Sequence, residues 1–315
     1  MKIKKVAGKI IEDSRGEETI KVLIKTGIGT FVASSPSGKS TGKNERKSYR
    51  GSIEKDIETL VDISPELEKI EIENFGDLKE VEKLVIDEEV KDKTKGSIGK
   101  LGANTLYALE ASILKALATE KNMEIWELIN KDARDFPSPV GNCIGGGLHG
   151  KKVKGKEPDF QEFLFIPKTE NFSDAVFLMG EAHQKCGEEL KARGVRGKRN
   201  DENAWRTSLS NEEVLIVMSK IKEELEKETG KEIRIGTDIA ASTFYTGVYE
   251  YKNPEKRLEK EEQIKHVLDL IDKYRIDYVE DPLDEEDFSG FAEIRREAVR
   301  DRPTSLVVGD DLTVS

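Results

Sequence analysis

Apolar and polar residues alternate along the first part of the chain. Ile20, Val22 and Ile24 are each separated by one residue, as a strand with one buried face requires. Residues 2–11 and 19–35 together have the pattern of three strands, and a glycine-containing turn at residues 26–30 separates the last two. The pattern predicts a three-stranded antiparallel meander.

Helical spacing then replaces alternation. Apolar residues recur at intervals of three and four in two stretches, represented by Leu78, Val81, Leu84 and Val85 and by Leu106, Leu109, Ile113, Leu114 and Leu117. Residues 1–135 are therefore predicted to form a small α+β domain. The Pro137-Ser138-Pro139 segment favours a boundary there.

Strand and helix patterns alternate through residues 136–315. Strand-like runs lie at 139–144, 160–166, 233–240, 276–280 and 305–309, and helical patterns lie at 172–193, 211–229, 259–274 and 287–300. This order favours a parallel sheet or barrel. A complete α/β barrel has eight strands and takes about 250 residues. We therefore predict a partial TIM-like barrel domain at 136–315, with about five of the eight strands.

Composition narrows the classes of function. The chain has 315 residues and a formal net charge of −11, which argues against a broad nucleic-acid-binding surface. The only cysteines, Cys143 and Cys186, form no CxxC pair, so a cytoplasmic location is predicted. No apolar run approaches the roughly 18–20 residues of a membrane span.

Acidic residues follow three successive predicted strands. Asp238, the pair Glu280 and Asp281, and the pair Asp310 and Asp311 each stand at the carboxyl end of a run. Barrel enzymes place their chemistry at that end. Converging carboxylates repel one another without a cation, and such hard oxygen ligands suit Mg²⁺. The alternative is that each residue caps the following helix, although three recurrences weaken that interpretation.

Two glycine-containing loops are further candidates. Residues 34–42 combine glycines and hydroxyls that suit a metal or phosphate, although a plain surface linker has the same composition. Residues 145–150 contain four glycines, which let a backbone approach a ligand closely, and His149, a candidate to contact a substrate anion. The alternative is that this lone histidine is structural or merely exposed. His183 and His266 lie inside helical patterns and are assigned no role.

The segments taken together resemble the enolase family of glycolytic phosphopyruvate hydratases. The similarity runs from near residue 14 to the last residue. It is carried by Ser14-Arg15-Gly16, Pro36-Ser37-Gly38-Lys39-Ser40-Thr41-Gly42, Lys100-Leu101-Gly102-Ala103-Asn104, Gly146-Gly147-Leu148-His149, Gln161-Glu162-Phe163, Asp238-Ile239-Ala240-Ala241-Ser242, Val279-Glu280-Asp281-Pro282 and Gly309-Asp310-Asp311-Leu312-Thr313-Val314. Each motif alone is weak, whereas their ordered series is specific.

The resemblance implies a role for each matching residue and two Mg²⁺ ions, one structural and one catalytic. Ligands of the structural ion would be Asp238, Glu280 and Asp310, the last two of which would also bind the substrate. Ser40 would reach the second ion. His149 and Glu162 would line the substrate site, and Glu202 would be the general acid. The implied reaction is the reversible dehydration of 2-phosphoglycerate to phosphoenolpyruvate, by a lyase of glycolysis and gluconeogenesis that forms dimers or larger homo-oligomers.

Two departures from the family pattern stand out. The family's Asp-Glu-Gly-Gly around the general acid is here Asp201-Glu202-Asn203-Ala204. The family's general-base lysine and phosphate-binding Arg-Ser pair come from later barrel strands, and no lysine within 1–315 replaces the base. The favoured hypothesis is an enolase recorded as an incomplete chain. The alternatives are a non-catalytic enolase-like binding or regulatory protein, and then an enzyme acting on another carboxylate.

The partial barrel also has consequences for the isolated 315-residue chain. Without the base, we expect this chain to dehydrate nothing. An open sheet leaves edges and apolar surface exposed, so aggregation or self-association is expected as well.

Overall fold

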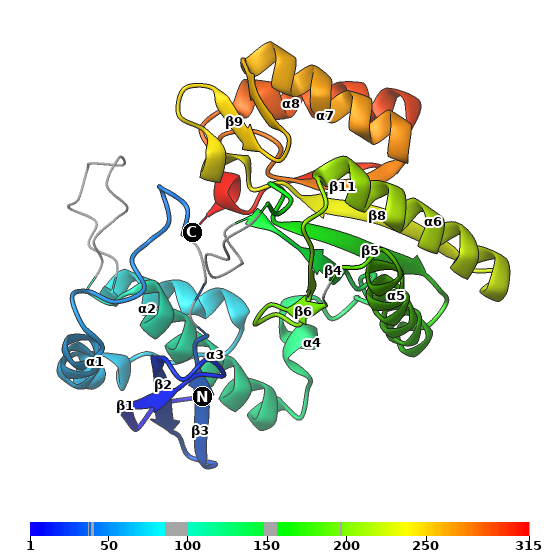
Figure 1. Cartoon of the computed structure of the whole chain (residues 1–315). Helices are drawn as coiled ribbons and strands as arrows, with labels where there is room; N and C mark the ends of the chain where they lie inside the picture. The colour runs from blue at the N-terminus through cyan, green and yellow to red at the C-terminus, as the bar shows by residue number, and fades with distance from the viewer. Residues whose placement is uncertain (37, 39–40, 86–99, 148–155, 196, 315) are drawn as a thin grey trace. The chain divides into compact units, whose positions relative to one another are not determined.

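The computed structural model describes residues 1–36, 38, 41–85, 100–147, 156–195 and 197–314 (Figure 1). Within this part of the chain, residues 1–135 belong to one compact unit and residues 136–313 to a second. Each unit has its own hydrophobic core.

The first unit contains the predicted meander. Strands β1 (Lys5–Glu12), β2 (Glu18–Lys25) and β3 (Thr30–Ser34) form an antiparallel sheet in the order β1-β2-β3. Ile20, Val22 and Ile24 are fully buried on β2, as their alternation predicts. The antiparallel α+β fold of this unit is confirmed.

Helices cover one face of this sheet. They are α1 (Ile53–Leu67), α2 (Leu78–Val85), α3 (Ala103–Lys121) and the short α4 (Ile125–Ile129), with the 3₁₀ turn η1 (Phe75–Asp77) before α2. α1 packs on β1, and α3 packs on β2 and β3. The hydrophobic pattern indicated α2 and α3. It did not indicate α1, which begins at the Ser52 cap and has Pro65 in its last turn.

The second unit is built on a seven-stranded sheet in the order β12-β11-β8-β5-β4-β7-β6. Its strands are β4 (Gly141–Gly145), β5 (Glu162–Lys168), β6 (Lys198–Arg199), β7 (Trp205–Arg206), β8 (Glu232–Asp238), β11 (Ile276–Glu280) and β12 (Leu306–Val308). Five of these coincide with the predicted runs. The pair β6–β7 and a separate hairpin, β9 (Tyr249–Lys252) with β10 (Glu255–Leu258), were not predicted.

Four long helices flank this sheet on the outside (Figure 1). They are α5 (Phe172–Ala192), α6 (Asn211–Thr229), α7 (Lys260–Tyr274) and α8 (Phe288–Asp301). α5 packs on β4 and β5, α6 on β8, α7 on β11 and α8 on β12. Short 3₁₀ turns η3 (Ala241–Phe244) and η4 (Asp311–Thr313) follow β8 and β12. No helix in the described ranges is long and apolar enough to cross a membrane.

The parallel arrangement that the strand–helix order favours does not extend to β5. β8, β11 and β12 run parallel, whereas β5 is antiparallel to both β4 and β8. A parallel connection needs a long crossover, usually a helix, and the described residues between β4 and β5 contain no α-helix. The reversal places the beginning of β5 beside the carboxyl end of β8.

Candidate active site

Three strands bring acidic residues into one row. In the antiparallel pair β5–β8, Glu162 stands opposite Asp238, and in the parallel pair β8–β11, Asp238 stands opposite Glu280. Glu280 is in turn paired with Val308 of β12, two residues before Asp310. The row therefore arises from backbone register, because paired positions on neighbouring strands lie side by side.

Asp238 lies at the centre of this row and is 6% exposed. One carboxylate oxygen, Oδ2, accepts a hydrogen bond from Gln161 Nε2 at 2.9 Å, and the other accepts from the Ala240 backbone N–H at 2.9 Å. Burial, followed by repulsion from Glu280 and Glu162, raises the pKa of Asp238 to about 9. The site therefore holds more negative charge than its protein surroundings neutralise.

The Glu280 side chain accepts a hydrogen bond from another residue of its own strand, β11. The Tyr278 hydroxyl donates to Glu280 Oε2 at 2.6 Å. Burial raises the pKa of Glu280, the Tyr278 hydrogen bond opposes this, and Asp281 and Asp310 raise it further. The side chains of Glu280 and Asp310 therefore share one electrostatic environment, although Asp310 itself is exposed.

Asp281 organises the backbone that carries Asp310. Its carboxylate accepts the backbone N–H of Asp310, at 3.2 Å to Oδ1, and of Asp311, at 2.8 Å to Oδ2. Asp281 is 2% exposed and has a φ of 40°, a left-handed conformation that non-glycine residues rarely adopt. Sequence reasoning assigned Asp281 no separate role. Its adjacency to Glu280 was the only signal.

The helix-cap alternative for these acids fails at two of the three strands. The helices after β8 and β11 are capped elsewhere, because α7 begins at Glu259 and α8 at Asp287, whose side chain accepts the Gly290 N–H. Asp238 accepts hydrogen bonds from the Ala240 amide and the Gln161 side chain, and Glu280 accepts one from Tyr278. These two acids, one buried and one half-buried, need another explanation.

The donor set fits a hard divalent cation. Among the described residues, no Lys or Arg forms an ion pair with Asp238, Glu280 or Asp310. Gln161, itself 7% exposed, places its Oε1 in this environment with no hydrogen-bond partner. In the described ranges no three acidic, His or Cys side chains yet converge closely enough to enclose a metal. Their present hydrogen bonds, Gln161 to Asp238 and Tyr278 to Glu280, hold two of the acids separately.

Glu202 lies in the turn between β6 and β7, on the far side of β4 from β5 in the sheet order. Asn200 Oδ1 accepts the backbone N–H of Glu202 at 3.0 Å and of Ala204 at 2.9 Å. Asn203 takes a φ of 68°, a conformation that glycine adopts without strain. The turn thus keeps a glycine-like backbone without the family's glycines.

Trp205, on β7, connects this turn to α5. Its indole Nε1 donates to the His183 carbonyl at 2.7 Å, and the two rings stack with centroids 5.4 Å apart. A Cβ on Gly187 would lie 2.4 Å from the Trp205 ring, so α5 needs glycine there. The Arg199 guanidinium lies over the Trp205 ring, with its Cζ 4.3 Å from the ring centroid. Sequence reasoning missed this support.

Two predicted site residues, Ser40 and His149, lie outside the described residues. The segment that follows Ser40 is anchored by the Lys100–Asn104 motif. The Gly102 N–H donates to the buried Asp56 carboxylate at 2.9 Å, and a Cβ on Gly102 would lie 2.2 Å from the Ser48 carbonyl oxygen. This close approach gives a physical reason for the glycine in that motif.

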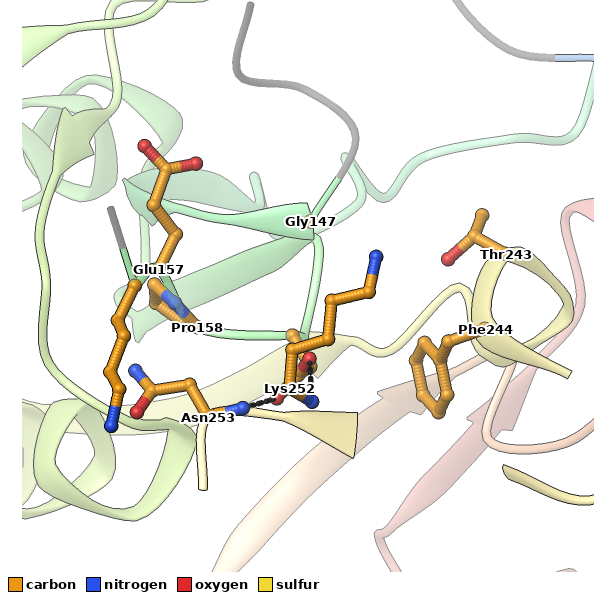
Figure 2. Close-up of a pocket in the computed structure, with 9 residues that line it drawn as sticks. Gly147, Glu157, Pro158, Thr243, Phe244, Lys252 and Asn253 are labelled. Atoms are coloured by element: carbon orange, nitrogen blue, oxygen red, sulfur yellow. Dashed lines mark hydrogen bonds between the residues drawn. The ribbon is translucent and has the colours of Figure 1, made fainter. Parts of the chain in front are cut away.

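A pocket of about 220 Å³ borders Gly147, immediately before the His149 segment (Figure 2). Its wall is fixed by Asp159, which accepts the backbone N–H groups of Lys252 at 2.8 Å and Asn253 at 3.0 Å. The side chains of Lys156 and Lys252 also line this pocket.

The strand–helix order and the acidic strand ends define the class of an α/β-barrel enzyme with a carboxylate-lined site. The family model "Enolase, N-terminal domain" matches residues 3–129, and "Enolase, C-terminal TIM barrel domain" matches residues 133–315. The chain belongs to the enolase family, and by this resemblance it is a lyase of the phosphopyruvate hydratase type.

Curated relatives agree with this assignment. The chain is 35% identical to an enolase of Natronomonas pharaonis over 97% of its own length and 74% of the relative's. It is 36% identical to an enolase of Methanocorpusculum labreanum, with the same coverage of 97% and 74%. It is 34% identical to an enolase of Methanothermobacter thermautotrophicus, covering 97% of this chain and 72% of the relative.

Proposed function

We propose that this chain carries the magnesium- and carboxylate-binding part of an enolase site that interconverts 2-phosphoglycerate and phosphoenolpyruvate in glycolysis and gluconeogenesis. The observation that supports this is the register that aligns Glu162, Asp238 and Glu280 across β5, β8 and β11. Among the described residues, neither Asp238, which is buried, nor Glu280, which is half-buried, has an ion-pair partner. Such carboxylates are costly unless a cation completes the site. The site belongs to a proposed barrel domain at 136–315, beside a proposed N-terminal domain at 1–135.

Each residue is proposed to have a defined task. Asp238, Glu280 and Asp310 would hold the structural Mg²⁺, and Ser40 would reach a second ion. Mg²⁺ supplies positive charge that stabilises negative charge developing on the substrate carboxylate during proton removal. Glu162 and His149 would line the substrate, and Glu202 would give a proton to the departing hydroxide.

The general base is proposed to be absent from residues 1–315. The family resemblance assigns that role to a lysine of a later strand, and no lysine in this sequence matches it. We therefore expect residues 1–315 to bind substrate and Mg²⁺ together without turning the substrate over.

Two assays test this function. Calorimetric titration of phosphoenolpyruvate into the chain should show binding with Mg²⁺ and none with EDTA. The ultraviolet absorbance of phosphoenolpyruvate should stay constant when the chain is incubated with 2-phosphoglycerate and Mg²⁺. Binding that ignores Mg²⁺ would contradict the proposed site, and turnover would show that a base within 1–315 had been overlooked.

A second candidate function is a non-catalytic enolase-like binding protein. The observation that favours it is the altered turn around Glu202, where Asn203 and Ala204 replace glycines. The Glu202→Gln variant separates the two candidates in any longer form of the protein that shows turnover. A large loss of rate with unchanged substrate affinity supports the enzyme. A homo-oligomeric assembly and a cytoplasmic location are further proposals drawn from the family.

A further inference from the structure

Among the described residues, Tyr278 donates a side-chain hydrogen bond to the Glu280 carboxylate. It stands two residues before Glu280 on β11, so both side chains leave the same face of the strand. Its hydroxyl donates to Oε2 at 2.6 Å, a short bond of the kind expected when the acceptor is a carboxylate. No described group hydrogen-bonds the second oxygen, Oε1.

Gly236 provides the space that Tyr278 occupies. In the β8–β11 register Gly236 stands directly opposite Tyr278. A Cβ on Gly236 would lie 3.0 Å from the Tyr278 Cβ and 3.2 Å from its Cδ1, closer than side chains normally pack. The tyrosine ring therefore rests against bare backbone, which fixes the direction in which its hydroxyl points.

We propose that Tyr278 is a positioning and specificity-determining residue, which restricts Glu280 to one metal-binding oxygen and thereby favours Mg²⁺ over Ca²⁺. The inference rests on the proposed function, since it assumes that Glu280 is a metal ligand. It concerns the residue that gives the site its preference between the two ions, which the family assignment does not supply.

The chemistry of the two ions makes this restriction selective. Mg²⁺ requires near-octahedral geometry with short bonds of about 2.0–2.1 Å, whereas Ca²⁺ takes six to eight oxygens and often binds both oxygens of one carboxylate. A carboxylate with one oxygen engaged by a phenol hydroxyl presents the other oxygen alone. Removing the hydroxyl would release Oε2 for two-oxygen binding and would free the Glu280 side chain to rotate.

Tyr278→Phe tests the proposal, because it removes the hydroxyl and keeps the ring against Gly236. Isothermal titrations of MgCl₂ and of CaCl₂ into the substrate-free 315-residue chain give the two affinities. We expect the Mg²⁺ affinity to fall about tenfold, within the range typical of changes to groups that orient metal ligands. The Ca²⁺ affinity should stay the same or rise, so the Mg²⁺-to-Ca²⁺ ratio should fall at least about tenfold.

Tyr274→Phe is the matched control. Tyr274, on α7, also donates its hydroxyl to a glutamate, Glu212, at 3.0 Å, and neither residue belongs to the acidic row. This variant removes a Tyr–Glu hydrogen bond of the same kind and should leave both metal affinities unchanged. Thermal unfolding in EDTA should show similar melting temperatures for the two variants.

The outcomes separate the inference from the function on which it rests. If wild-type protein binds Mg²⁺ and Asp238→Asn abolishes binding, the metal site stands. Tyr278→Phe then decides the inference alone. Equal losses for Mg²⁺ and Ca²⁺, or no change in either, would overturn the role of Tyr278. If wild-type protein shows no saturable Mg²⁺ binding, the proposed site fails and the inference fails with it.

Discussion

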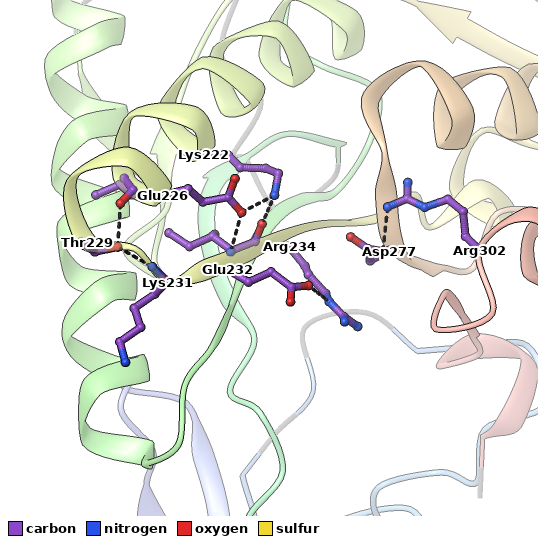
Figure 3. A network of polar contacts seen from close by, with 10 residues as sticks. Lys222, Glu226, Thr229, Lys231, Glu232, Arg234, Asp277 and Arg302 are labelled. Carbon is purple, nitrogen blue, oxygen red and sulfur yellow. Dashed lines mark hydrogen bonds and ion pairs between the residues drawn. The ribbon is translucent and has the colours of Figure 1, made fainter.

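Charged side chains are arranged differently at the two ends of strands β8 and β11. At the amino ends, acidic and basic side chains form ion pairs: Glu232 with Arg234 at 2.7 Å, and Asp277 with Arg302 at 2.8 Å (Figure 3). Lys222 on the neighbouring helix pairs with Glu226 at 2.5 Å. At the carboxyl ends, Asp238 and Glu280 face other acids, and no described cation pairs with either.

This difference distinguishes charged groups that stabilise the fold from charged groups that bind a ligand. At the amino ends, these acidic side chains have basic partners, and a hollow of about 340 Å³ lies among the side chains. The acidic end keeps the buried Asp238 next to the half-buried Glu280, where their mutual repulsion opposes folding. Groups held at such a cost are typical of sites that bind a ligand, and here the ligand that would remove the cost is a cation.

The largest expected effect is at the acidic end. Asp238→Asn should weaken Mg²⁺ binding about a thousandfold, equal to about 4 kcal/mol, because it removes a central charged ligand. The melting temperature of the metal-free protein should stay the same or rise, because a neutral amide replaces a buried carboxylate that no cation compensates. Calorimetric titration and thermal unfolding in EDTA measure the two quantities. A lower metal-free melting temperature with intact Mg²⁺ binding would reverse the comparison.

The paired end should respond in the opposite way. Asp277→Asn should lower the free energy of unfolding by about 2–3 kcal/mol, because it leaves the mostly buried Arg302 guanidinium without its carboxylate. Mg²⁺ affinity should not change. Glu232→Gln is the control, since Glu232 is 56% exposed and its pair with Arg234 should contribute under about 1 kcal/mol. Urea denaturation measures the change in unfolding free energy for each variant. Equally small losses would show that the Asp277–Arg302 pair contributes no more to stability than the exposed pair.

Burial of a single carboxylate provides a third test. Glu110 on α3 is partly buried, and burial together with the nearby Glu82 raises its pKa from the usual 4.5 to about 7. The folded first unit therefore binds a proton between these values that the unfolded chain does not. The contribution of Glu110 to the stability of this unit should be largest below about pH 4.5 and should be lost as the pH rises through about 7.

Glu110→Gln should flatten this pH profile. At pH 8 the variant should be more stable by about 1–2 kcal/mol, a figure reduced to allow for the partial solvent exposure of the group. At pH 4.5 the difference should vanish, and Mg²⁺ affinity should be unaffected throughout. Hydrogen exchange of α3 amides across this pH range would report the change; an unaltered profile would show that burial does not control this group.

The smallest effect is expected in the turn around Glu202. Asn203→Gly should change stability by less than about 1 kcal/mol, because the relief of the left-handed backbone offsets the lost Arg199–Asn203 hydrogen bond of 2.9 Å. Asn203→Ala should cost about 1 kcal/mol, since alanine loses the hydrogen bond and gains no backbone freedom. Thermal unfolding ranks the two variants, and a more stable Ala variant would contradict this explanation of the turn.

The sequence was informative wherever regular periodicity determines position. The ends of β8 at Asp238 and β11 at Glu280 could be read from short apolar runs followed by acids. The four long helices of the second unit could also be predicted within a residue or two. In each case a local repeat determines the element, and the element determines where the side chain lies.

Features that depend on contacts between distant segments could not be predicted. The antiparallel direction of β5, which places Glu162 opposite Asp238, depends on the connection from β4 and leaves no periodic signal. The stacking of Trp205 on His183 joins β7 to α5 across 22 residues of sequence. The support that Asp281 gives Asp310 is likewise visible only when the two strand ends lie together.

If the carboxyl ends of β8, β11 and β12 form one divalent-cation site, a bound metal ion should be visible there by diffraction. Crystals of the 315-residue chain can be soaked in Mn²⁺, an anomalous scatterer that replaces Mg²⁺ at oxygen sites. We expect an anomalous peak bound by oxygens of Asp238, Glu280 and Asp310. Strong Mn²⁺ peaks elsewhere, with none among these three side chains, would contradict it.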